Sequence, residues 1–246
     1  MNLLTIFVFV LIIVLIYMVY KLMTKSTTTV SGFSDATRAL NVPCDKFGVS
    51  ANYGYSVWVY IDAWQNTVDS PDNSKIYKKN ILTRCGSSTA NPSFPVFNLY
   101  LDNEQNNLNL LVNGTTKACK IQNVQLQKWI NITMSIYGNT VDMYLDGKLV
   151  RTCILTSTPA ATTTSDTLYV GGVYDSSNKP CTATDGGDLN GYISNVVYKN
   201  DYFTPEEAWS IYSDGYSGNG LFDFIHRYKL NFSLIKDNQT LGQVSV

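Results

Sequence analysis

The chain has 246 residues, a formal net charge of −1 and 13% aromatic residues, with acidic and basic residues interspersed along it. This balance excludes the basic stripe of a nucleic-acid-binding protein and the acidic tail of a disordered one, so no nucleic-acid partner is expected. The many Tyr, Thr and Asn residues and the small number of Glu residues favour strands and turns over helices.

The first predicted element is an apolar helix at the N-terminus. Residues 3–20 carry no charged side chain, and at about 1.5 Å per residue they approach the hydrocarbon thickness of a bilayer. Two residues precede the run and no A-x-A-like cleavage site follows it, so we expect a retained transmembrane helix over residues 1–24 rather than a cleaved signal peptide. The expected anchor residues are Leu3, Ile6, Phe7, Phe9, Ile12, Leu15, Tyr17, Tyr20 and Lys21.

The basic residues predict the orientation of this helix. Lys21 and Lys25 follow the apolar run, and no acidic residue occurs before Asp35. Because basic residues gather on the cytosolic side of a membrane, we expect a single-pass membrane protein with a lipid bilayer as partner and a cytosolic C-terminal domain.

The next segments are predicted to be a tether followed by many strands. Residues 25–50 are rich in Thr, Ser, Gly and Asp and read as a tether. Strand runs follow at 55–61, 97–101 and 108–112. Three turn dipeptides, Asn113-Gly114, Gly138-Asn139 and Asp146-Gly147, each separate two β-rich runs. Dipeptides that accept positive φ between such runs indicate hairpins, so an antiparallel meander is expected.

The alternation of side chains predicts a second layer against this meander. Ile130, Ile132, Met134 and Ile136 point to one face of their strand, and the next strand presents a matching apolar face. An apolar sheet face has to be covered, which implies a two-sheet sandwich.

One short helix and a final β segment complete the predicted elements. Thr204 is a helix N-cap followed by Pro205 and two acidic residues, and the helix is expected to run to Tyr212 and end near Asp214-Gly215. Residues 213–246 are expected to form a C-terminal β extension, in which Lys236 to Gln239 are a turn into a last strand.

The five cysteines, Cys44, Cys85, Cys119, Cys153 and Cys181, contain no C-x-x-C pair, which argues against a zinc cluster. Their odd number and even spread predict mostly reduced thiols, as in a cytosolic domain. Four N-x-[ST] sequons begin at Asn113, Asn131, Asn231 and Asn238, and we interpret them as incidental.

Five segments together resemble the laminin-G-like, concanavalin A-like jelly roll family. They are 55–59 with a central Trp58, the strand from Trp129, the 141–150 hairpin, the 168–172 strand that ends in two glycines, and 191–196 with the helix start near Thr204. The resemblance covers residues 51–212 and implies an all-β fold of two antiparallel sheets with one short helix. With an N-terminal anchor, the chain also resembles virion membrane proteins of large DNA viruses.

Candidate catalytic residues are few. Asp102 and Glu104 have the i, i+2 spacing of paired acids, but their run of polar residues is typical of a solvated loop rather than of a glycosidase centre. His226 is the single histidine, which excludes sites that need two. We therefore expect no enzyme and no catalytic residue.

Two kinds of binding site stay open. Some family members hold Ca²⁺ with rim-loop oxygens, and Asp175, Asp185 and Asp188 are candidate ligands, although Asp-Gly pairs are also ordinary turn formers. Asp62 and Trp64 follow the Trp58 strand and are candidates for a ligand rim that faces a sugar. No other cofactor is expected.

The first functional hypothesis is a membrane-anchored, non-enzymatic structural protein that links an internal viral membrane to capsid proteins of the virion. The alternative is a lumenal or extracellular carbohydrate-binding or adhesion module that uses Ca²⁺ and rim aromatics. A third hypothesis, a glycan hydrolase, would use Asp102 and Glu104.

Overall fold

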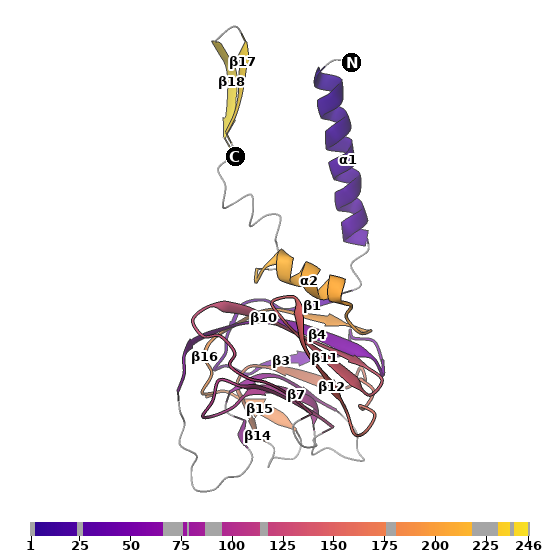
Figure 1. The fold of residues 1–246 in the computed structure, drawn as a ribbon, viewed down its shortest axis with the longest axis vertical. Coiled ribbons are helices and arrows are strands. Elements are labelled where there is room, and N and C mark those ends of the chain that lie inside the picture. Colours follow the sequence, from indigo (N-terminus) through magenta and orange to yellow (C-terminus); the bar gives the residue numbers. More distant parts are fainter. Residues whose placement is uncertain are drawn as a thin grey trace.

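The structure is a computed structural model of the whole chain, and it describes residues 3–23, 27–65, 76–77, 79–86, 95–113, 118–175, 181–217, 231–236 and 239–245. Its main body is a sandwich of two antiparallel sheets stacked face to face, with helix α2 (Pro205–Asp214) lying against the outer side of one sheet (Figure 1). The predicted all-β, two-sheet fold with one short helix is therefore confirmed.

The first sheet has the strand order β1-β16-β4-β10-β11-β12, and β2 also pairs with β16. Its strands are β1 (Thr27–Ser31), β2 (Ser34–Asp35), β4 (Tyr53–Ala63), β10 (Trp129–Tyr137), β11 (Thr140–Leu145), β12 (Lys148–Ile154) and β16 (Asn190–Lys199). Strands β10, β11 and β12 form the predicted meander.

The second sheet has the order β3-β13-β6-β7-β8-β9. Its strands are β3 (Leu40–Pro43), β6 (Asn80–Cys85), β7 (Pro95–Leu101), β8 (Leu108–Val112), β9 (Cys119–Ile121) and β13 (Thr167–Val170). A small sheet joins β5 (Ile76–Tyr77), β14 (Val173–Asp175) and β15 (Thr182–Thr184), and β17 (Asn231–Lys236) pairs with β18 (Gln239–Ser245). This last hairpin occupies the predicted β extension.

The core lies between the two sheets, as the alternating pattern predicts. Ile130, Ile132, Met134 and Ile136 of β10 are at most 4% exposed. The opposite face of β10 is also covered: Ser135 Oγ donates to the carbonyl of Phe203, which lies in the segment that leads into α2, at 3.1 Å. The first sheet is therefore packed on both faces along part of its length.

Local turn chemistry explains the hairpins and the helix start. Gly138 at the β10–β11 turn has a φ of 56°, and Asp146 and Gly147 at the β11–β12 turn have φ values of 49° and 73°. These are conformations that Gly, Asn and Asp accept at low cost, which confirms the hairpin predictions. Helix α2 begins with a complete capping box of Thr204 and Glu207.

The predicted tether over residues 25–50 is wrong. Residues 27–43 contain β1 and β2, which pair with β16 in the first sheet, and β3, which pairs with β13 in the second. These edge strands are short and mostly exposed, so they lack the hydrophobic alternation that identifies a strand in a sequence.

The prediction of mostly reduced thiols is also wrong. Cys85 is bonded to Cys181 and Cys119 to Cys153, with Cα atoms 5.6 Å and 5.7 Å apart, and Cys44 is buried with a free thiol. The partners are 96 and 34 residues apart in sequence, and the fold brings them together. Cys119 and Cys153 lie in edge strands of different sheets, β9 and β12, whereas Cys85 lies in the interior strand β6.

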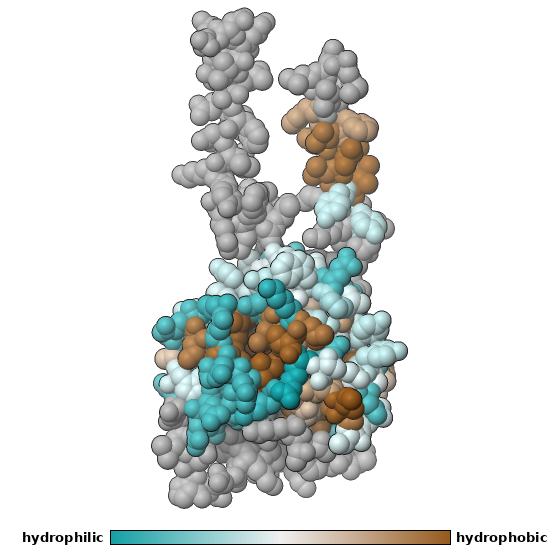
Figure 2. All heavy atoms as spheres, in the orientation of Figure 1, coloured by the Kyte–Doolittle hydropathy of each residue, from teal (hydrophilic) through white to brown (hydrophobic). Residues whose placement is uncertain are grey.

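Helix α1 (Leu3–Met23) forms where the apolar run predicts a helix. Its described side chains, which include Phe7, Phe9, Ile12, Leu15, Tyr17 and Tyr20, are 48–65% exposed. Figure 2 shows a column of hydrophobic residues along part of this helix. The side chains of Leu3, Ile6 and Lys21 lie outside the described part.

No helix among the described residues is both long enough and apolar enough to cross a bilayer. This finding contradicts the predicted single-pass membrane localisation with a cytosolic domain.

Candidate functional site

A polar groove opens at one edge of the sandwich, where three chain segments meet. Trp64 follows the end of β4, residues 102–107 connect β7 to β8, and residues 122–126 follow β9. The cavity has a volume of about 600 Å³ and is lined by Trp64, Glu104, Gln105, Asn106, Asn107, Gln122, Asn123 and Leu126. We call it the Trp64 groove.

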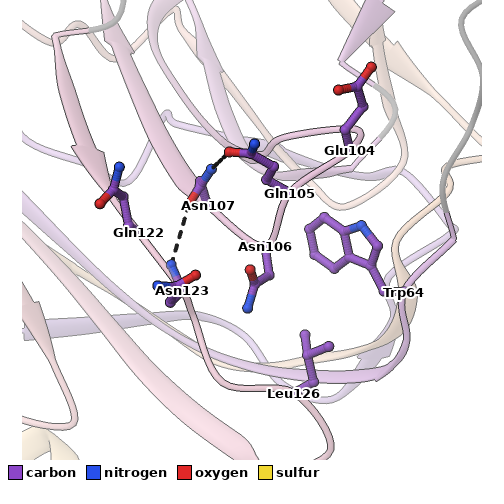
Figure 3. Close-up of a pocket in the computed structure, with 8 residues that line it drawn as sticks. All are labelled: Trp64, Glu104, Gln105, Asn106, Asn107, Gln122, Asn123 and Leu126. Atoms are coloured by element: carbon purple, nitrogen blue, oxygen red, sulfur yellow. Dashed lines mark hydrogen bonds between the residues drawn. The ribbon is translucent and has the colours of Figure 1, made fainter.

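Asn107 holds the 102–107 loop in shape. It is 3% exposed, and its Nδ2 donates to Gln105 Oε1 at 2.6 Å and to Asp102 Oδ2 at 3.3 Å. Its Oδ1 accepts a hydrogen bond from the backbone N–H of Asn123 at 3.3 Å. Figure 3 shows the bonds of Asn107 to Gln105 and to Asn123, and the second of these joins the two polar walls of the groove. One buried amide thus connects both loops.

Asn106 makes a second connection between the same walls. Its Nδ2 donates to the carbonyl of Val124 at 2.9 Å, and the backbone N–H of Val124 donates to the carbonyl of Asn106 at 2.8 Å. Asn123 makes this approach possible by adopting a φ of 57°, which Asn tolerates better than most residues. The groove is therefore pre-formed by hydrogen bonds within the chain.

A buried lysine supports the aromatic side of the groove. Lys79 is 1% exposed, its Nζ lies 4.8 Å from the centroid of the Trp64 ring, and it donates to the carbonyl of Asn103 at 2.8 Å. This cation–π contact and the hydrogen bond fix the indole relative to the 102–107 loop. In Figure 3 the Trp64 ring lies beside Asn106 and Leu126.

The chemistry of the lining suits a neutral ligand with many hydroxyl groups. Five of the eight lining residues carry a side-chain amide, which both donates and accepts hydrogen bonds, and one carries an indole. Glu104 adds one carboxylate, while nearby Asp102 is within 3.4 Å of Lys120 Nζ and is balanced by it.

A family model described as the concanavalin A-like lectin/glucanases superfamily matches residues 34–208. The chain belongs to this superfamily. The predicted laminin-G-like resemblance is therefore confirmed at the level of the family.

The solved structures that resemble this chain share little sequence identity with it. The receptor binding domain of the botulinum neurotoxin C/D mosaic serotype aligns with a TM-score of 0.51 and 13% identity over 76% of this chain and 44% of that chain. Trypanosoma rangeli sialidase aligns with a TM-score of 0.44 and 14% identity over 66% of this chain and 22% of that chain. The chain spans less than half the length of either protein. At 13% identity, the likeness to the receptor binding domain shows the fold alone. No curated protein matches the sequence.

The structure brings together some of the site residues that the sequence predicted. Trp64, predicted as a ligand rim, and Glu104, weighed as half of an acid pair, both line the groove. Asp62 is exposed at the end of β4 and Asp102 bonds to Asn107 behind the groove, and neither is among the lining residues. The viral capsid partner stays a prediction that neither the fold nor the comparisons support.

The candidate calcium ligands do not form a cluster in the described part of the chain. Asp185 Oδ1 accepts a hydrogen bond from the backbone N–H of Ala39 at 2.8 Å, Asp188 lies just before β16, and the side chain of Asp175 is outside the described part. No group of three or more acidic, His or Cys side chains in the described regions could hold a metal. A calcium site therefore stays a prediction, and His226 lies outside the described residues.

The sequence reasoning missed the amide side chains of the groove. A signal was present, because residues 103–107 contain four amide residues and Gln122-Asn123 adds two more. What the sequence did not show is that the loops on either side of β8 and β9 fold against each other and against Trp64.

Proposed function

We propose that this protein is a non-enzymatic carbohydrate-binding module that holds a neutral saccharide in the Trp64 groove. The observation that carries the proposal is the lining itself, one indole face beside five side-chain amides in a pre-formed cavity. The face of an aromatic ring is electron-rich and attracts the C–H bonds on one side of a pyranose. The buried amide of Asn107 is taken up by hydrogen bonds within the chain. The other four amides of the lining can donate to and accept from the hydroxyl groups of the sugar.

Binding is favoured over hydrolysis because the groove has too few acids. Glycosidases of the usual kinds use two carboxylates on either side of the scissile bond. Glu104 is the single carboxylate among the described lining residues, and Asp102 lies within reach of Lys120 instead. The shared fold does not decide the matter, since it carries both lectins and enzymes.

The test is calorimetric titration of the full chain with neutral oligosaccharides, namely mannotriose, lactose and N,N′-diacetylchitobiose. At least one should bind, and Trp64→Ala should weaken it about tenfold or more, the loss expected when a stacking ring is removed. Trp209→Ala is the matched control, because Trp209 is 50% exposed on α2 and is not a groove residue. Absence of binding by all three sugars, or equal affinity of Trp64→Ala and wild type, would refute the proposal.

Two additions to the same titration separate the alternatives. Repeating it with EDTA tests the predicted calcium dependence. Incubation of the sugars with wild type and with Glu104→Gln tests for hydrolysis. We expect no cleavage by either protein, and products that disappear with Glu104→Gln would identify an enzyme instead.

A further inference from the structure

The two disulfides differ in how far the chain covers them. Cys85 and Cys181 are each 5% exposed, so that bond is shielded from a reagent in solution. In the other bond Cys119 is 4% exposed, but Cys153 is only half-buried on the edge strand β12. A thiol that reduces a disulfide has to reach one of its two sulfurs. The Cys119–Cys153 bond is therefore the more accessible of the two.

Basic side chains flank the accessible bond. Lys120 follows Cys119 directly, and Arg151 lies two residues before Cys153, so Arg151 and Cys153 share one face of β12. Arg151 Nη1 donates to the carbonyl of Lys120 at 2.9 Å, which brings the guanidinium to β9. Positive charge stabilises a cysteine thiolate, and a stabilised thiolate leaves faster when its disulfide is attacked. The charges around this bond therefore favour its reduction.

The same bond holds one wall of the Trp64 groove. Strand β9 has three residues and lies at the edge of the second sheet, beside β8. Gln122 and Asn123, which line the groove, follow β9 directly (Figure 3). Lys120 Nζ also lies 3.4 Å from Oδ2 of Asp102, at the start of the other wall. Loss of the disulfide removes the covalent anchor of β9 to β12, so we expect the wall after β9 to loosen.

We propose that Cys119–Cys153 is a redox-active disulfide, whose reduction by a dithiol opens the edge between β9 and β12 and loosens the groove wall. A thiolate of the dithiol attacks the Cys153 sulfur, the S–S bond breaks, and Cys119 leaves as a thiolate. The second thiol of the reductant then attacks the mixed disulfide and releases Cys153. The reductant is oxidised to its own disulfide, and the two cysteines take up its two protons.

Reduction of this bond does not depend on what the groove binds. Only the effect on a bound sugar rests on the function proposed above. The loosening of residues 119–126 is a property of the chain alone and can be measured without a ligand. The redox proposal and the sugar-binding proposal can therefore fail separately.

The test is limited reduction of the native full chain with dithiothreitol, followed by alkylation with iodoacetamide and peptide mass mapping. Cys119 and Cys153 should be labelled about tenfold faster than Cys85 and Cys181, because the first pair is accessible and flanked by positive charge. Equal rates for the two pairs, or reduction only as fast as global unfolding allows, would refute the proposal.

Two substitutions test the role of the charge. Lys120→Gln should slow reduction of the Cys119–Cys153 bond severalfold, because it removes a charge that stabilises the leaving thiolate. Lys148→Gln is the matched control, since this exposed lysine lies near the opposite end of β12 from Cys153. An equal effect of the two substitutions would overturn this account of the reactivity of the bond.

Hydrogen exchange tests the effect on the groove. Amide exchange within residues 119–126 should rise in the reduced protein and in the double variant Cys119→Ser/Cys153→Ser, while exchange in the interior strand β6 should stay slow. Unchanged exchange within residues 119–126 after complete reduction of this bond would overturn its coupling to the groove, whatever the result of the sugar titration.

Discussion

Arg84 shows how one residue can organise the interior of the sandwich. It is fully buried, and its Nε donates to Asp166 Oδ2 at 2.7 Å. Its other nitrogens donate to the Tyr55 hydroxyl at 2.6 Å and to the Thr163 carbonyl at 2.8 Å. The cost of burying a charged guanidinium is offset by a paired carboxylate and by directed hydrogen bonds. Arg84 thus joins β6, β4 and the segment before β13.

Removal of the carboxylate should destabilise the fold strongly. Asp166→Ala leaves the Arg84 charge buried without its counter-ion, a change that typically costs about 3–5 kcal/mol of unfolding free energy. Urea unfolding followed by circular dichroism measures the loss. Asp62→Ala is the control, because Asp62 is exposed at the end of β4 and its removal should change stability little. A loss below about 1 kcal/mol for Asp166→Ala, the size of an exposed ion pair, would contradict this view of the network.

At the scale of one element, helix α2 depends on Glu207. The backbone N–H of Thr204 donates to Glu207 Oε2 at 2.9 Å, and Lys199 Nζ lies 2.6 Å and 2.7 Å from the two carboxylate oxygens. Burial by itself raises the pKa of Glu207, but the hydrogen bonds from Lys199 and Thr204 outweigh it and the pKa is lowered. The ionised form therefore stabilises the start of the helix and its contact with β16.

This predicts a defined pH dependence. Because the folded pKa lies below the ordinary value of 4.5, the stabilisation by Glu207 is complete above that pH and is lost as the pH falls through the folded pKa. In thermal unfolding at pH 7, wild type should melt at a higher temperature than Glu207→Gln. This difference in melting temperature should shrink below about pH 5. Glu206→Gln, one residue earlier in the same first turn, is the control. A difference in melting temperature between wild type and Glu207→Gln that grows as the pH falls would contradict this prediction.

The elements differ in how far the sequence predicts them. Hairpins at Gly138 and Asp146 and the helix start at Thr204 could be predicted, because their causes lie within four residues of chain. Strands β1 to β3 could not, because they are stabilised by pairing with distant strands rather than by their own pattern. The Trp64 groove belongs to the second class, since Trp64 and Gln122 are brought together by the order of strands in two sheets.

For the whole molecule, the two disulfides connect parts that the sheets alone leave separate. Cys119 lies in β9 and Cys153 in β12, so this bond joins an edge strand of one sheet to an edge strand of the other. Cys85 of β6 is bonded to Cys181, just before β15. A disulfide closes a loop in the unfolded chain and lowers the entropy of the unfolded state, which stabilises the folded state. Disulfides that close loops of this length typically stabilise a domain by roughly 2–5 kcal/mol.

Thiol counting tests this arrangement directly. In denaturant without reductant, Ellman's reagent should find one thiol per chain, and after reduction it should find five, the number of cysteines in the sequence. In the native protein that single thiol should react slowly, because burial raises the pKa of Cys44 to about 11. Cys44→Ala should leave no thiol before reduction, and a count of three or five in the unreduced wild type would contradict the pairing.

The longer of these bonds has a mechanical consequence. A pull on the two ends of the chain passes across Cys85–Cys181 and bypasses the residues between them. Both amide-bearing walls of the groove, residues 102–107 and 122–126, lie inside that covalent loop, whereas Trp64 lies outside it. Stretching would therefore draw the indole away from the two intact walls. If the groove binds a sugar as we propose, tension would release that sugar while the walls keep their structure.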